Sequence, residues 1–161
     1  MTGDLIILEQ ASSNGGRGSR KYQVAAGATT INPGEPVARA LGAPTVTAAA
    51  TNTPVVATDF FVGIAQSTST QTASVAGEVT VIPIDSDTTW LISPKVAATW
   101  DTQSEYNALV GDRVLIDLTA GAYTLLATDG ATSGVVVQQL NVAEHPGKVA
   151  VAFRKGVSDL T

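Results

Sequence analysis

The chain contains no cysteine, which excludes a disulfide framework and any thiolate metal site. Charged residues make up only 14% of its 161 residues, against roughly 25% in an average soluble protein. The formal net charge of -5 argues against nonspecific nucleic-acid binding, which depends on neutralising phosphates with Lys and Arg. No apolar run approaches the roughly 18 residues of a membrane-spanning helix. These absences predict a soluble protein with a polar but uncharged surface, suited to packing against other proteins.

The N-terminal 20 residues predict a flexible arm. Leu5, Ile6, Ile7 and Leu8 form a short apolar run between two acidic residues, and the sequence ASSNGGRGSR follows. An export signal needs a basic start and a longer apolar core, so we do not expect one here. Glycine, serine and asparagine favour a flexible segment that buries nothing. We therefore expect an arm over residues 1–20 and a single β-rich domain over residues 21–161.

Basic residues gather where the arm meets the domain. Arg17, Arg20 and Lys21 are three of the nine basic residues, whereas residues 40–94 contain no Lys or Arg. Such a cluster is either a solvated linker or an electrostatic anchor for an acidic partner surface.

Alternating apolar and polar residues predict β-strands along most of the chain. Four segments open with glycine, a charged residue and an apolar run: GEPVARAL at Gly34, GEVTVIPI at Gly77, GDRVLIDL at Gly111 and GKVAVAF at Gly147. We expect glycine to supply an unusual turn dihedral at each opening. Further strands are expected at residues 22–25, 37–41, 61–65, 90–92, 123–128 and 135–140. The pattern predicts a mainly β protein, a compact β-barrel or sandwich.

One segment, TQSEYNALVG, predicts a short helix near residues 102–110. Thr102 and Glu105 have the spacing of a capping box at a helix N-terminus. Tyr106, Leu109 and Val110 would then share one apolar face.

Residues capable of catalysis or metal binding do not form a recognisable set. His145 is the only histidine and lies in a predicted turn, AEHPG. Asp85 and Asp87 could hold calcium only if further oxygen ligands converged on them. Asp112 and Asp117 lack the pairing of an acid and a base, and no phosphate-binding glycine motif occurs. We predict no catalytic residue, cofactor or metal, and hence no enzyme.

Several segments together resemble one protein family. They are VARALGAPTVTAAATNTPVVATDFFVGIAQSTS, AGEVTVIPI, YNALVGDRVLIDLTAGAYTLLATDG, SGVVVQQLN and GKVAVAF. In this order they resemble the head decoration, or capsid cement, proteins of tailed bacteriophages, over roughly residues 21–155.

The resemblance implies a compact, β-tulip-like domain without catalytic residues. It also implies a virion protein, made in the host cytoplasm, that sits on the outer surface of the expanded head, often as a homotrimer. Its partner would be the major capsid protein, whose neighbouring subunits it would tie together. Under this hypothesis Leu5 to Leu8 add as a strand to a capsid edge and become ordered only on binding.

Residues 66–76 form a long, uncharged loop between two predicted strands. One interpretation is an assembly loop that offers hydroxyl and amide hydrogen bonds at a trimer or capsid contact. The other is a solvent loop without a partner. The residues assigned to the assembly loop are Gln66, Ser67, Thr68, Ser69, Thr70, Gln71 and Thr72.

A second function class stays open from the sequence. A carbohydrate-binding or adhesive β-module of a viral fibre could stack sugars on Trp90, Trp100 or Tyr123. For the two tryptophans, packing in a core or a subunit interface is the favoured interpretation.

Overall fold

A computed structural model describes residues 6–10, 18–50, 59–84, 88–119, 122–127 and 133–153. The protein is mainly β, as the sequence predicts, with one short α-helix and one 3-10 turn among these residues. The strands are β1 (Ile6–Gln10), β2 (Arg20–Val24), β3 (Pro36–Ala40), β4 (Thr47–Ala48), β5 (Asp59–Ala65), β6 (Gly77–Pro83), β7 (Thr88–Ile92), β8 (Arg113–Thr119), β9 (Ala122–Leu126), β10 (Val135–Val137) and β11 (Val149–Phe153). The helical elements are η1 (Ala97–Thr99) and α1 (Gln103–Leu109).

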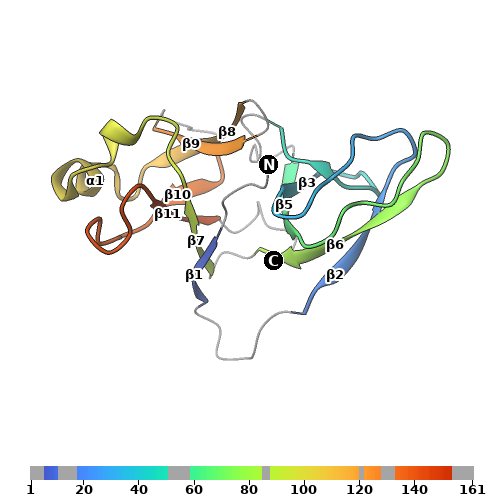
Figure 1. The fold of residues 1–161 in the computed structure, drawn as a ribbon, viewed down its shortest axis with the longest axis horizontal. Coiled ribbons are helices and arrows are strands. Elements are labelled where there is room, and N and C mark those ends of the chain that lie inside the picture. Colours follow the sequence, from blue (N-terminus) through green and yellow to red (C-terminus); the bar gives the residue numbers. More distant parts are fainter. Residues whose placement is uncertain are drawn as a thin grey trace.

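The strands form two sheets that lie side by side (Figure 1). One has six strands in the order β1-β7-β11-β10-β8-β9, and the other has five in the order β2-β6-β5-β3-β4. Every pairing between these strands is antiparallel. We call the first sheet with α1 the six-stranded lobe, and the second sheet with its loops the five-stranded lobe.

Each sheet curls until two of its strands meet through a single parallel bridge. In the five-stranded lobe Val24 bridges to Val46, so the two edges of the sheet approach one another. In the six-stranded lobe Pro94, just after β7, bridges to Leu125 in β9. The backbone of Leu125 donates to Ser93 at 2.9 Å. Both sheets are therefore barrel-like without being continuously closed, and β1 lies outside the ring that runs from β7 to β9.

Strand β5 contributes to two hydrophobic clusters because both of its faces are buried. Phe61 and Ile64 join the cluster that fills the six-stranded lobe, whereas Val62 and Ala65 belong to a cluster inside the five-stranded lobe. Regular alternation would place Phe61 and Ile64 on opposite faces, but a bulge interrupts the pairing with β3, where Val62 has no register partner. The bulge shifts the alternation by one residue, so Phe61 and Ile64 reach the same cluster. The predicted β-rich region thus has two cores, and β3 contributes to both of them as well.

Two contacts made by aromatic residues join the lobes: a ring stack and a hydrogen bond from a tyrosine hydroxyl. The rings of Phe61 in β5 and Phe153 in β11 stack with centroids 4.3 Å apart. The Tyr123 hydroxyl in β9 donates a hydrogen bond of 2.8 Å to the carbonyl oxygen of Ala49, just after β4. Burial raises the pKa of Tyr123 to about 12, with a further contribution from the negative charge of Glu35.

The predicted helix is confirmed as α1. Thr102 is its N-cap, and its hydroxyl accepts a hydrogen bond from the backbone of Glu105. Tyr106 is the buried residue of the helix, and Val110, which the sequence pattern placed on the same face, is 36% exposed just beyond the helix end. In the described part of the chain, no helix is long and apolar enough to cross a membrane.

Tyr106 anchors α1 to the six-stranded sheet. Its hydroxyl accepts a hydrogen bond from the backbone of Ala150 in β11 and donates one to the carbonyl oxygen of Gln138, both at 2.9 Å. The ring also meets Trp100 edge-on, with centroids 5.7 Å apart. Burial raises the pKa of Tyr106, so the hydroxyl stays protonated and keeps both bonds.

Candidate functional site

The loop over residues 66–76 folds back on its own lobe. Ser69 is buried, and its hydroxyl accepts a hydrogen bond of 2.8 Å from the backbone of Ile31. The backbone of Ser69 donates in return to the carbonyl of Ile31 at 2.9 Å. The Gln71 amide donates to the carbonyls of Ala28 and Thr29, both at 3.1 Å. Other hydrogen bonds of the loop join Gly27 N to Thr72 O, Gln66 N to Thr80 O, Thr70 N to Glu78 O and Thr80 N to Ser67 Oγ.

The close fit of this loop requires a glycine at the start of β6. A Cβ on Gly77 would lie 2.0 Å from the backbone nitrogen of Gln71. Gly34, Gly111 and Gly147 do have positive φ angles, as expected for the glycine-charge openings. Gly77 is not among the positive-φ glycines. Its role is to let two backbone segments approach.

The folded loop leaves a rigidly supported, uncharged surface at the end of the five-stranded lobe. Together with the neighbouring loop after β2, it extends away from the six-stranded lobe (Figure 1). Val75 is 61% exposed, although it is a large apolar residue. We call this surface the distal tip; its exposed residues are Ala26, Gly27, Thr29, Thr30, Thr72, Ala73, Ser74, Val75 and Ala76.

The apolar run of the predicted arm pairs with its own chain. Ile6 to Gln10 form β1, which adds to β7 at the edge of the six-stranded sheet. Ile7 lies opposite Trp90 and Glu9 opposite Thr89, and a bulge at Leu8 interrupts the register. The assigned residue Leu5 lies outside the described residues.

The basic cluster lies on the other sheet. Arg20 and Lys21 are exposed at the start of β2, and Arg17 lies outside the described residues. Lys21 forms an ion pair with Glu78 at 3.3 Å, with both side chains largely exposed. An exposed pair of this kind contributes little to stability. The structure therefore does not bring the basic residues and the apolar run together on one sheet.

The aromatic residues that the carbohydrate hypothesis needs are all buried. Trp90 and Trp100 are each 2% exposed and Tyr123 is 3% exposed. A sugar ring must reach the face of an aromatic side chain in order to stack on it. These three residues pack in the core of the six-stranded lobe, so they offer no binding platform.

Acidic and basic side chains do not converge into a reactive site in the described part of the chain. Within it, no three His, Cys, Asp or Glu residues lie close enough to hold a metal ion. Asp117 is buried and forms an ion pair with Lys95 at 2.8 Å. That pair links β8 to the segment after β7. Asp85 and Asp87 lie outside the described residues.

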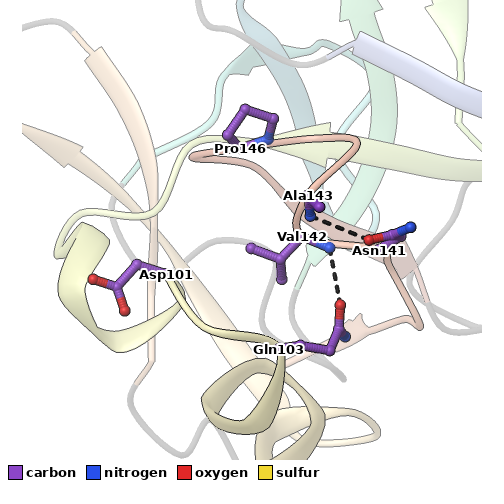
Figure 2. Close-up of a pocket in the computed structure, with 6 residues that line it drawn as sticks. All are labelled: Asp101, Gln103, Asn141, Val142, Ala143 and Pro146. Atoms are coloured by element: carbon purple, nitrogen blue, oxygen red, sulfur yellow. Dashed lines mark hydrogen bonds between the residues drawn. The ribbon is translucent and has the colours of Figure 1, made fainter.

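An open surface pocket of about 520 Å³ lies between the start of α1 and the loop before β11 (Figure 2). Figure 2 shows that two of its polar side chains serve the protein itself: Gln103 accepts from the backbone of Val142 and Asn141 accepts from that of Ala143. Among the described residues that line the pocket, Asp101 alone carries a carboxylate. The pocket therefore lacks the converging polar groups of a substrate site.

Comparison of the chain with known protein families, with curated protein sequences and with solved structures finds no match.

Proposed function

We propose that this protein is a structural virion protein that binds the outside of the expanded head of a tailed phage. It stabilises the head by linking neighbouring major capsid subunits, and it acts as a homotrimer. The observation that carries the proposal is the separation of two candidate contact surfaces. The edge strand β1 belongs to one lobe and the distal tip to the other.

A protein that links two neighbours needs two contact surfaces on one firm body. Here the stacked pair of Phe61 and Phe153 and the hydrogen bond from Tyr123 hold the lobes together. A capsid subunit bound at either surface then transmits load through a packed core. Several such links act together on one head, so individual contacts of roughly the standard 1,600 Å² suffice.

The two surfaces suit protein contacts in different ways. In the described structure β1 pairs on one side only, so its outer edge can add to a strand of a capsid subunit. The distal tip carries no charge to desolvate, and the loop's internal hydrogen bonds hold it in place before binding. Preorganisation of this kind lowers the entropic cost of association.

Cosedimentation with expanded heads, stripped of decoration and taken from the virus that encodes this chain, tests the proposal. We expect saturable binding at a fixed ratio to the capsid subunit. Deletion of residues 1–10 or the substitution Val75→Glu should each weaken binding on the order of tenfold or more. Val96→Glu is the matched control, because Val96 is 59% exposed but lies outside both surfaces. Absence of binding to intact heads would contradict the proposed function.

A further inference from the structure

We propose that β1 is exchanged between copies of this chain, so that Ile6–Gln10 of one copy pairs with β7 of a second copy. The proposal rests on the way β1 is attached to the fold. It concerns contacts between copies and does not depend on capsid binding.

Strand β1 supplements a sheet that is assembled without it. The bridge from Pro94 to Leu125 joins the segment after β7 to β9, so the other five strands already form a ring. Among the described residues β1 pairs only with β7. Its departure would break one ladder and leave the ring in place. An edge strand held by one ladder lies at the low end of local stability.

The vacated edge of β7 accepts the same segment from any copy. Backbone pairing and register are identical whether β1 comes from the same chain or from another, which is the basis of domain swapping. The bulge at Leu8 and the pairs Ile7 with Trp90 and Glu9 with Thr89 would be reproduced between copies. The segment that fills the vacated edge of β7 is therefore Ile6–Gln10 of a second copy.

The connection between β1 and β2 determines when exchange occurs. Residues 11–19 separate them, and nine residues span at most about 30 Å when extended. A short tether rich in glycine and serine gives an effective concentration on the order of 1 mM. Pairing within one chain then dominates in dilute solution. Pairing between copies becomes as frequent as pairing within one chain when the protein concentration approaches that effective concentration.

Cysteine trapping tests the exchange directly, because the natural chain has no cysteine. One protein carries Glu9→Cys and a second, distinguishable by mass, carries Thr89→Cys. These positions are register partners, and partners in an antiparallel pair lie within disulfide distance. The two proteins are mixed at about 10 µM to about 1 mM and mildly oxidised. We expect a mixed disulfide between copies whose yield rises with concentration, as seen by non-reducing electrophoresis and mass spectrometry.

The matched control mixes a Gln23→Cys protein with a Glu78→Cys protein. These exposed register partners join β2 to β6, and β2 is also bridged to Val46 through Val24. We expect the β1–β7 mixture to give at least about tenfold more mixed disulfide than this control, because β1 exchanges between copies whereas β2 stays in its own sheet. Equal yields at all concentrations would overturn the proposal.

A single chain carrying both Glu9→Cys and Thr89→Cys completes the test. At about 10 µM it should form an intrachain disulfide, because the tethered β1 outcompetes other copies. Absence of any disulfide, within a chain or between copies, would also overturn the proposal, since β1 would then not occupy β7. No head is present in these experiments, so their outcome is independent of head binding.

Discussion

The six-stranded lobe buries large aromatic side chains, whereas the five-stranded lobe buries mostly valine. The first core contains both tryptophans and four other aromatic residues. None of the eight buried residues of the second core is aromatic. Apolar area determines the hydrophobic contribution, so each buried residue of the five-stranded lobe contributes less.

The five-stranded lobe adds a network of loop hydrogen bonds to its smaller core. Ser69 and Gln71 connect the loop before β6 to the loop after β2. Such bonds contribute about 1 kcal/mol each when made but cost more when one partner is left unpaired in a buried position. We therefore expect the lobes to respond to different kinds of substitution.

The largest effect should come from the residue that joins the two lobes. Phe61→Ala removes a fully buried ring and its stack on Phe153, which should lower the free energy of unfolding by about 3 to 5 kcal/mol. Chemical denaturation followed by tryptophan fluorescence measures the loss, because both tryptophans lie in the core that Phe61 enters. Phe60→Ala is the control, since Phe60 is only half-buried and lies beside Arg39. Equal losses for the two variants would show that the junction is not the more sensitive position.

A second test concerns the hydrogen bond that the Tyr123 hydroxyl donates between the lobes, and it uses the ionisation of that hydroxyl at high pH. The pKa of Tyr123 is raised to about 12, against about 10 for an unfolded tyrosine. Its neutral form therefore contributes stability that is complete below pH 10 and is lost as the pH rises towards 12, by about 2 to 3 kcal/mol. Denaturation midpoints between these pH values should fall less in Tyr123→Phe than in the natural protein. Parallel pH profiles would contradict this role for Tyr123.

A third test concerns the close approach of the loop to β6. Gly77→Ala places a methyl group against the backbone of Gln71, which should destabilise the protein by about 1 to 3 kcal/mol. Gly18→Ala is the control, because a Cβ there meets nothing within 4 Å. Thermal unfolding of the two variants compares them directly. A Gly77→Ala protein as stable as the control would mean that the loop packs less closely.

Local patterns in the sequence predicted local structure well. Alternation of apolar and polar residues located most strands, and Thr102 with Glu105 marked the start of α1. Both signals depend on neighbours in the chain. Strand β10 ends at Val137, earlier than the predicted strand over residues 135–140. The Gln138 nitrogen still donates to the carbonyl of Ala150, but the Tyr106 hydroxyl lies between the Gln138 carbonyl and the Ala150 nitrogen and bonds to both.

These local patterns do not predict which segments far apart in the sequence pair or pack together. Nothing in the apolar run near Ile6 indicates that it pairs with β7, some 80 positions away, because strand pairing is decided by the whole fold. The division of the strands into two cores likewise depends on how β5 is flanked on both sides. Hydroxyl-rich composition at residues 66–72 predicted hydrogen bonding but not its partners, several of which lie within the same lobe.

The smallest expected effect separates buried from exposed serine in that loop. Ser69→Ala leaves the buried backbone nitrogen of Ile31 without its hydroxyl acceptor, which should cost about 1 to 2 kcal/mol. Ser74→Ala makes the same chemical change at an exposed position of the distal tip, so we expect a difference within about 0.5 kcal/mol of zero. Urea denaturation resolves the two cases, and hydrogen exchange at Ile31 shows whether the loss is local. If both variants behave alike, the hydrogen bonds of the loop do not support the small valine core, and the contrast between the lobes is one of side-chain size alone.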